Sequence, residues 1–187
     1  MCPARVTLTK STERHSVLFR VIRKVLLGGV RSLSGVLSQE RYMFLLVLVL
    51  KSFGVNFRGM PLYISPRCWL DVTDLSKITF EGQTVVSHYV SILTHDYSMA
   101  RMRDAITNKR NVPEIALVKP VHIGFNSFVG LGSILLPGTT IGSNCVIGAG
   151  SVVRGNIPDN SLVAGNPARI IGDSLEYGNR KLAESGL

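Results

Sequence analysis

A six-residue period in the second half of the chain constrains its fold more than any other feature. From residue 117 the sequence reads LVKPVH, IGFNSF, VGLGSI, LLPGTT, IGSNCV, IGAGSV and VRGNIP. The first position of every step is aliphatic, the second is often Gly, and the fifth is usually Ser, Thr or Cys. Neither the 3.6-residue period of a helix nor the two-residue period of a plain strand gives this pattern. A hexapeptide repeat is typical of a parallel β-helix.

The repeat predicts a structural role for each of its positions. We expect the first-position side chains to point inward and to stack on their counterparts in neighbouring coils; they are Leu117, Ile123, Val129, Leu135, Ile141, Ile147 and Val153. A small fifth residue fits the crowded inside of a turn. We attribute Gly at the second position to backbone angles that other residues avoid. Three repeats then complete one triangular coil.

The period also divides the chain into parts. Upstream it continues less regularly, with Phe80, Val86 and Ile92 in phase, so the β-helix is expected over residues 55–172. Residues 98–116 break the period and are expected to form a loop extruded from the coil directly after His95. Residues 1–54 form a basic, apolar, helical segment, and residues 173–187 form a C-terminal tail. The fold class is therefore mainly β, with helices at the N-terminus.

Positive charge is concentrated near the N-terminus. The net charge is +9, and residues 1–58 hold ten Lys and Arg against two Glu, which places +8 in that segment. Residues 12–53 read as helix, with a second helix at about 41–52, and their apolar stripe comprises Leu18, Val21, Ile22, Val25, Leu33 and Val36. These helices could cap the open first coil of the solenoid. They could also anchor the protein on an anionic membrane, and the two roles are compatible.

Several classes of protein are disfavoured by the rest of the sequence. The opening MCPARVTLTK lacks the apolar region of a signal peptide, and the longest apolar run, YMFLLVLVL, is about half of what spans a bilayer. Three cysteines, an odd number, argue against a disulfide framework. The basic segment matches no nucleic-acid-binding motif. We expect a cytoplasmic protein, peripheral at the inner face of the cell membrane, with no nucleic-acid partner.

The stretch KPVHIGFNSFVGLGSILLPGTTIGSNCVIGAGSVV, followed by IPDNSLVAGNPARII, resembles the hexapeptide-repeat acyltransferases. The likeness is greatest to the O-acetyltransferases of sugars and surface polysaccharides, the relatives of maltose and galactoside acetyltransferases. It implies a left-handed parallel β-helix, a homotrimer, and acetyl-CoA as donor with no metal required. The expected function is acetyl transfer to a sugar hydroxyl in capsule, exopolysaccharide or lipopolysaccharide, or in a lipid-linked precursor.

The resemblance also implies a catalytic residue. In that family a histidine that follows a hexapeptide strand, just before the extruded loop, acts as general base, and His95 in ILTHDYS matches it. Imidazole suits this role because its ordinary pKa lies near neutral pH. Asp96 is a candidate to orient the imidazole or to bind the acceptor. Neighbours in an extended strand point to opposite sides, so direct pairing of Asp96 with His95 requires a turn there.

Further candidate residues concern the two substrates. By matching motifs, the resemblance places five residues along coenzyme A, at the pantetheine arm or near its phosphates: Gly130, Leu131, Ala149, Arg154 and Arg169. Arginine suits phosphate, because its guanidinium group forms charge-assisted hydrogen bonds. Asp71 and Asp74, in the irregular coil before His95, are candidates to bind sugar hydroxyls.

Two other functions fit parts of the sequence. One is a metalloenzyme that resembles gamma-class carbonic anhydrase, with His88, His95 and His122 as zinc ligands. The closely spaced later histidine pair of that family is missing here, which argues against it. The other is a non-catalytic trimeric scaffold held at a membrane by its helices.

Overall fold

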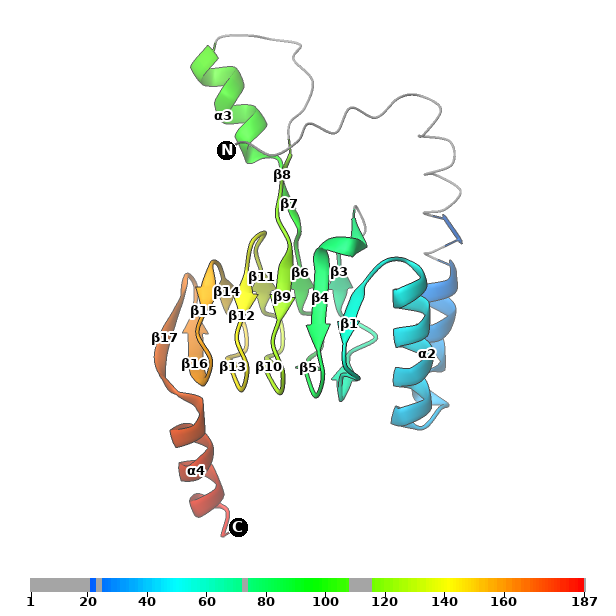
Figure 1. Cartoon of the computed structure of the whole chain (residues 1–187), viewed down its shortest axis with the longest axis vertical. Helices are drawn as coiled ribbons and strands as arrows, with labels where there is room; N and C mark the ends of the chain where they lie inside the picture. Colours follow the sequence, from blue (N-terminus) through cyan, green and yellow to red (C-terminus); the bar gives the residue numbers. More distant parts are fainter. Residues whose placement is uncertain (1–20, 23–24, 72–73, 108–115, 187) are drawn as a thin grey trace.

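Short strands joined by sharp turns wind into a prism with three flat sides (Figure 1). The computed structural model describes residues 21–22, 25–71, 74–107 and 116–186. Sheet A has the order β1-β4-β9-β12-β15, namely Asn56–Arg58, Ile78–Glu81, Val121–Ile123, Thr140–Ile141 and Asn156–Ile157. Sheet B has the order β17-β16-β13-β10-β5-β2, namely Ala168–Asp173, Ser161–Gly165, Val146–Ile147, Phe128–Val129, Val85–Val86 and Tyr63–Ile64. Sheet C has the order β14-β11-β6-β3, namely Val152–Val153, Ile134–Leu135, Ser91–Ile92 and Trp69–Leu70.

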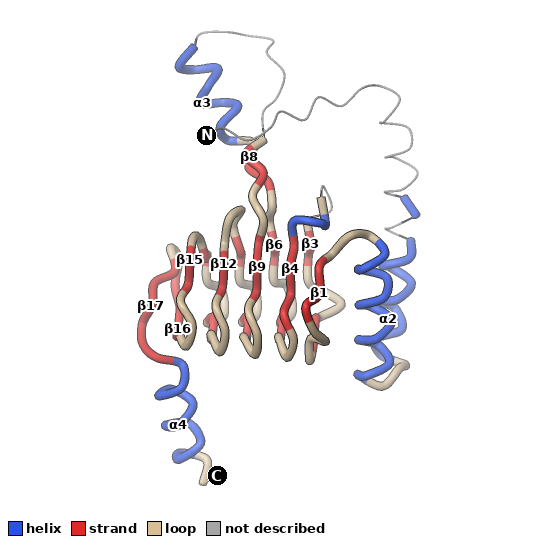
Figure 2. The backbone as a smooth tube through the Cα atoms, viewed as in Figure 1, coloured by secondary structure: helices blue, strands red, loops and turns tan. Residues whose placement is uncertain are grey.

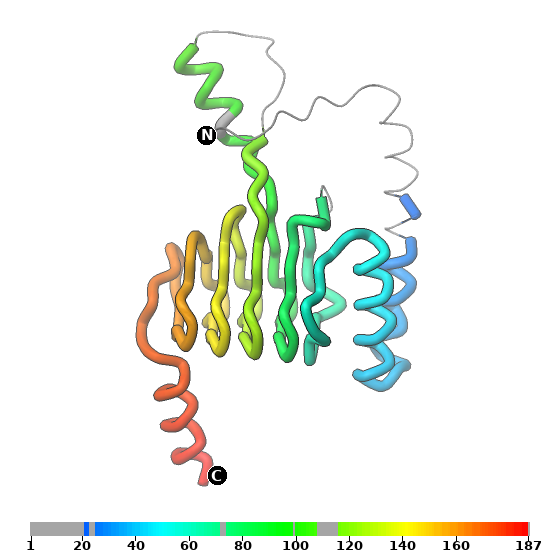
Figure 3. The backbone as a smooth tube through the Cα atoms, viewed as in Figure 1, coloured from blue at the N-terminus to red at the C-terminus, as the bar shows by residue number. Residues whose placement is uncertain are grey.

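Each strand pairs in parallel with the strand one coil further along the chain. Phe128 pairs with Val146 and Ile134 with Val152, so neighbouring coils are offset by three hexapeptides. Within sheets A, B and C the exception is β17, which folds back antiparallel on β16. The coils follow one another in chain order from the N-terminal to the C-terminal end of the prism (Figure 3).

The core consists of aliphatic columns inside the prism, one behind each sheet. Six of the seven predicted first-position residues are fully buried: Ile123, Val129, Leu135, Ile141, Ile147 and Val153. The prediction is wrong for Leu117, which is exposed because it lies outside the coils, in a strand of the extruded loop. Cys68 and Cys145 are buried and free, while Cys2 lies outside the described residues.

The turns explain the remaining positions of the repeat. Fifth-position hydroxyls are buried and donate to backbone oxygens, as Ser127 Oγ does to the Gly142 carbonyl at 2.7 Å. The reason given above for second-position Gly is wrong. A Cβ at Gly124 would lie 2.4 Å from the Gly142 carbonyl oxygen, so close approach of the next coil requires glycine there. The left-handed angles occur at the fourth position instead, as at Asn126 and Asn144.

The extruded segment is a stalk with a helix at its tip. β7 (His95–Asp96) pairs antiparallel with β8 (Leu117–Val118), and α3 (Ser98–Thr107) follows β7. The segment rises well clear of the prism (Figure 1). It therefore begins at His95 itself, three residues earlier than the period alone predicted. Residues 108–115 lie outside the described residues.

Helices lie at both ends of the coil stack (Figure 2). α2 (Gln39–Ser52) covers the first coil and buries Tyr42, Met43, Leu46, Val47 and Leu50. It follows helical residues 25–32 and the short 3-10 helix η1 (Leu33–Gly35). A second 3-10 helix, η2 (Leu75–Lys77), precedes β4, and α4 (Ser174–Glu184) projects beyond β17. No helix within the described residues is long and apolar enough to cross a membrane.

The N-terminal apolar stripe is not part of the cap that α2 forms. Val21, Ile22, Val25, Leu33 and Val36 are exposed, with Val25 at 67%. Only Leu27 of the described residues before η1 is buried. Leu18 lies outside the described residues. The capping role thus belongs to α2, and the preceding stripe faces solvent.

The close contact at Gly124 predicts a large loss of stability for Gly124→Ala. The new methyl group would meet backbone atoms of the next coil, so the coils must separate, at a cost of about 1–3 kcal/mol in the free energy of unfolding. Urea denaturation followed by circular dichroism measures it. Gly178→Ala in α4 is the control, because nothing lies within 4 Å of its Cβ and alanine favours a helix. Equal losses in both variants would contradict this account of the coil contact.

Candidate active site

The stalk emerges from the prism at a buried carboxylate that contacts the His95 imidazole. His95 Nδ1 contacts Asp71 Oδ2, and the Asp71 side chain is only 1% exposed. The same oxygen accepts hydrogen bonds from the Thr94 backbone nitrogen at 3.0 Å and from the Thr94 hydroxyl at 2.8 Å. A carboxylate at Nδ1 keeps the proton on that nitrogen, so the lone pair of the neutral ring is on Nε2.

This contact follows from the stacking of two coils. Trp69 pairs with Ser91 and Leu70 with Ile92 in sheet C, so the residues after β3 and after β6 reach the same corner of the prism. We call this the C–A corner, because the chain passes there from sheet C to sheet A. Asp71 comes directly after Leu70, and Thr94 and His95 come shortly after Ile92. The stalk then fixes the His95 backbone through its pairing with Val118.

Asp96 has a different environment from the one expected for an orienting residue. Its Oδ1 accepts a hydrogen bond from the Ser98 backbone nitrogen at 2.7 Å, at the start of α3. Hydrogen bonds from the Ser98 backbone and hydroxyl lower the pKa of the Asp96 carboxyl, and the Arg154 charge lowers it further. The side chain that contacts the imidazole at Nδ1 is therefore Asp71. Arg154 directly follows β14, so it lies at the same C–A corner, two coils beyond β6.

The two aspartates proposed to bind sugar are separated by their environments. Asp71 is buried against Thr94 and His95, which leaves its carboxylate engaged inside the protein. Asp74 is half-buried and caps η2, accepting from the Ser76 backbone nitrogen at 3.0 Å. A local cap accounts for Asp74, whereas Asp71 belongs to the histidine site.

Four of the five residues matched to coenzyme A lie along one corner. This B–C corner, where the chain passes from sheet B to sheet C, carries Gly130 and Leu131 in one coil and Ala149 in the next, with the Leu131 carbonyl accepting from Gly150. Arg169 pairs with Ala164 at the end of the same column. Leu131, Ala149 and Arg169 are exposed. Gly130 has a packing reason as well, since its Cβ would lie 2.6 Å from the Ala149 nitrogen.

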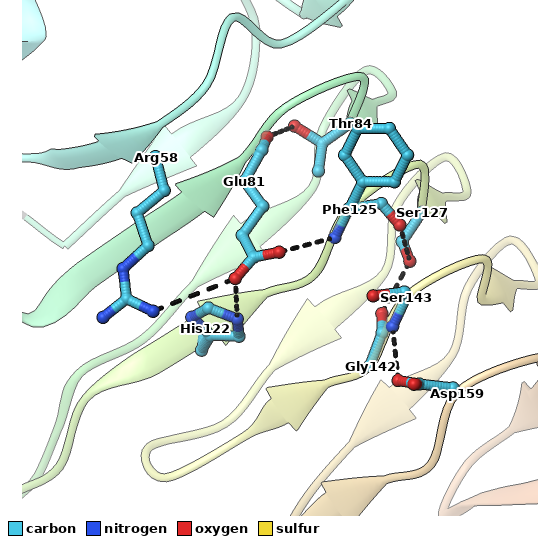
Figure 4. Close-up of polar contacts among 9 residues, drawn as sticks. All are labelled: Arg58, Glu81, Thr84, His122, Phe125, Ser127, Gly142, Ser143 and Asp159. Carbon is cyan, nitrogen blue, oxygen red and sulfur yellow. Dashed lines mark hydrogen bonds and ion pairs between the residues drawn. The ribbon is translucent and has the colours of Figure 1, made fainter.

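The other histidines lie elsewhere on the prism. On the outer face of sheet A, the Glu81 carboxylate lies between Arg58, His122 Nε2 and the Phe125 backbone nitrogen, with the imidazole at 3.2 Å (Figure 4). His88 lies at the B–C corner, between the rings of Tyr63 and Tyr89. The three candidate zinc ligands are thus dispersed within one chain. Among the described residues, no group of three or more His, Cys, Asp or Glu could hold a metal ion.

Two members of the site were missed from the sequence. Thr94 supplies two donors to Asp71, and the Tyr97 ring lies edge-on to the His95 ring with centroids 5.0 Å apart. Alignment of coils would have found Thr94, because Leu70 and Ile92 hold equivalent inward positions. Leu70 and Ile92 are 22 residues apart, not the 18 of a regular coil, because VTDLSKI interrupts the repeat. The regular period therefore does not align these two coils.

The repeats form the left-handed parallel β-helix that the family resemblance implied. The model of the bacterial transferase hexapeptide family (six repeats) matches residues 120–155. A maltose O-acetyltransferase from Clostridium difficile superposes with a TM-score of 0.54 at 26% identity, over 82% of this chain and 87% of that one. A galactoside acetyltransferase solved with coenzyme A shares the fold, with a TM-score of 0.50 at 19% identity over 84% and 83%.

Sequence relatives are named as acetyltransferases. Escherichia coli WbbJ, named as a lipopolysaccharide biosynthesis O-acetyl transferase, is 32% identical over 105 residues, which are 55% of this chain and 54% of WbbJ. An acetyltransferase of Saccharomyces cerevisiae is 34% identical over 117 residues, 60% of this chain and 56% of the relative. The chain thus spans about half the length of these relatives.

The buried carboxylate predicts an unusually costly Thr94→Val substitution. The change removes a hydroxyl that donates to a buried charged group, and we expect about 1.5–3 kcal/mol of lost stability. Thr84→Val is the matched control, because the equally buried Thr84 hydroxyl donates to the neutral Glu81 carbonyl and should cost about 0.5–1.5 kcal/mol. Urea denaturation measures both. Equal costs would mean that Asp71 is not charged in the folded protein.

Proposed function

We propose that this protein is an O-acetyltransferase that moves an acetyl group from acetyl-CoA to a sugar hydroxyl. The observation that carries the proposal is the His95 imidazole, held at Nδ1 by buried Asp71 at the base of a stalk on a hexapeptide β-helix. The similarity to the maltose O-acetyltransferase, over most of both chains, supports the reaction class. The similarity to WbbJ supports a surface polysaccharide, such as lipopolysaccharide, capsule or exopolysaccharide, or a lipid-linked precursor.

In the proposed mechanism His95 is the general base. Nε2 takes the proton of the acceptor hydroxyl as its oxygen attacks the thioester carbonyl carbon. The new C–O bond forms and the C–S bond breaks, and the imidazolium returns the proton to the departing sulfur. The products are an acetyl ester and free coenzyme A. Asp71 is a positioning residue that fixes the ring and stabilises the transient imidazolium charge. Thr94 holds Asp71 in turn.

Acetyl-CoA is proposed to lie along the B–C corner. The exposed Ala149 permits close approach of the thin pantetheine arm, which would run past Gly130 and Leu131. The exposed Arg169 guanidinium at the end of this column suits a phosphate group. Arg154 lies at the C–A corner, directly after β14, and is proposed to meet a second anionic group of either substrate.

A homotrimer would bring the donor corner to the histidine. Within one chain, sheet C separates the B–C corner, where acetyl-CoA is proposed to lie, from the C–A corner, where His95 lies. We propose that the B–C corner of a second copy approaches His95 and completes the site. The outer face of sheet B supports such packing, because its side chains Val85, Phe128, Val146 and Leu162 are apolar, whereas sheet A presents Thr79, His122, Thr140 and Asn156. We propose that sheet B faces the neighbouring copy.

The N-terminal stripe is proposed to contact an anionic membrane. Exposed Val21, Ile22, Val25 and Val36 would enter the interface, and the basic residues of the segment would contact lipid phosphates. Such contact suits an acceptor that is lipid-linked or assembled at the membrane. The proposed location is therefore the cytoplasmic face of the cell membrane.

The base assignment predicts that His95→Ala abolishes turnover without loss of donor binding. We expect acetyl transfer to fall about 10²–10⁴-fold in kcat. We expect Asp71→Asn to lower kcat by up to about 10⁴-fold, because the ring loses its charged partner. Mass spectrometry of the acceptor glycan, incubated with acetyl-CoA, detects the gain of one acetyl group. Coenzyme A binding is followed by calorimetry.

Two controls separate this assignment from the alternatives. His122→Ala removes an imidazole from sheet A and should retain full turnover, and Asp96→Asn should retain most of it. A scaffold protein would show no acetyl transfer in the wild type. A zinc enzyme would lose activity in His88→Ala and His122→Ala as well as in His95→Ala.

The membrane proposal predicts that Val25→Glu weakens binding to vesicles of phosphatidylglycerol and phosphatidylcholine. Val25→Glu removes one valine side chain from the bilayer interface and adds a negative charge, which should reduce partitioning about tenfold. Added salt should weaken the binding of the wild-type protein to these vesicles. Ile106→Glu is the matched control, because Ile106 is an exposed apolar residue of α3. Sedimentation with vesicles measures partitioning. The contact would be refuted if both variants bound equally well. It would also be refuted if the wild-type protein bound neutral vesicles as well as anionic ones.

A further inference from the structure

Exposed tryptophan and tyrosine rings gather on the first two coils of the prism and at the base of the stalk. Trp69 is 47% exposed, Tyr89 55% and Tyr97 45%. Among the described residues, the exposed phenylalanines lie elsewhere: Phe44 on α2, Phe125 between sheets A and B, and Phe128 on sheet B. The separation is chemical, since Trp and Tyr combine an apolar ring face with a hydrogen-bonding group, whereas Phe has no such group.

Trp69 lies in sheet C, Tyr97 beyond its end at the base of the stalk, and Tyr89 in the turn that leads into β6. We call these three rings the aromatic track (Tyr97, Trp69 and Tyr89). Tyr97 begins it, in contact with the His95 ring. Trp69 pairs with Ser91, which precedes His95 by four residues, or roughly 13 Å of extended chain. Tyr89 precedes His95 by six residues, or roughly 20 Å. The track thus runs from the proposed base to the B–C corner.

Polar groups and a pocket border the far end of the track. Arg67 donates to the Tyr89 hydroxyl at 2.6 Å, and its guanidinium carbon lies 5.6 Å from the centre of that ring. Tyr89 occupies the left-handed fourth position of its repeat, with φ of 59°, as Asn126 and Asn144 do in theirs. Beside it, a pocket of about 290 Å³ is lined by Gln39, Tyr63, Pro66 and His88, among others.

We propose that the aromatic track binds the acceptor as a glycan chain of several sugar rings. The inference rests on the proposed acetyl transfer and specifies its substrate class. A sugar ring has an apolar C–H face with a rim of hydroxyls, which matches an aromatic face bordered by donors and acceptors. A single sugar at His95 would reach only Tyr97. The use of Trp69 and Tyr89 requires a longer chain, whose terminal or internal hydroxyl lies at the imidazole.

The position of Trp69 allows a binding test that does not depend on turnover. It is the only tryptophan of the chain, so its fluorescence reports the middle of the track. The full-length protein is titrated with mono-, di-, tetra- and hexasaccharides of glucose, galactose, N-acetylglucosamine and N-acetylneuraminic acid. We expect at least one hexasaccharide series to change the emission and to bind about tenfold or more tightly than its own monosaccharide. Absence of binding across the panel, or affinity that is independent of chain length, overturns the proposal.

Substitutions then assign the binding to the track. Trp69→Ala and Tyr89→Ala should each weaken the hexasaccharide about tenfold by calorimetry. Trp69→Ala, which lies away from the B–C corner, should also leave the affinity for coenzyme A unchanged. Phe125→Ala is the matched control, an exposed ring off the track that should bind as wild type does. Unchanged hexasaccharide affinity in Trp69→Ala and Tyr89→Ala overturns the proposal. So does a change in oligomeric state in light scattering, since the rings would then be a subunit interface.

The result is distinguishable from failure of the proposed reaction. Length-dependent binding that Trp69→Ala weakens, without acetyl transfer from acetyl-CoA, retains the track and rejects the transferase. Acetyl transfer that depends on His95 but is equally efficient, in kcat/KM, on mono- and hexasaccharides rejects the track and retains the transferase.

Discussion

Register between successive coils is the constraint on which the rest of this structure depends. Backbone hydrogen bonds align each short strand with the strand one coil away, and the alignment stacks aliphatic side chains into continuous inner columns. A strand of two residues would not be stable alone, because it buries too little surface against the entropy of ordering it. In the stack, each coil is the template for the next. Close backbone contact at glycines such as Gly124 maintains that spacing.

The same register creates the candidate active site. Asp71 and His95 are 24 residues apart in sequence and meet because β3 and β6 pair in sheet C. The carboxylate is buried in the corner, where Thr94 supplies two of its donors, while the imidazole stays partly exposed. A rigid scaffold therefore positions the histidine from one side, and the pairing of β7 with β8 positions it from the other. Such double support is what pre-organised general-base chemistry requires.

The features that sequence could predict are those that repeat. The inward residues from Ile123 to Val153 follow from period alone, because every coil solves the same packing problem. Leu117 fits the period and yet lies in the stalk, where it pairs antiparallel with Asp96. The hexapeptide period carries no signal for this pairing, so it could not be predicted. His95 was located by resemblance to a family, but its partner was sought next to it in sequence rather than one coil away. Adjacent residues in a strand diverge, whereas residues of stacked coils converge, so Asp71 and not Asp96 reaches the ring.

The two ends of the coil stack limit how copies of this chain can associate. An open β-helix end presents unpaired backbone groups on which a further chain could add strands, as in fibril growth. Here α2 covers the first coil. At the other end β17 reverses direction and pairs antiparallel with β16. The last repeat before it is shortened, because Val153 and Ile157 are four residues apart rather than six. End-to-end polymerisation into filaments is thereby blocked. Assembly is left to the flat sides of the prism, which favours closed rings of few subunits over open-ended aggregates.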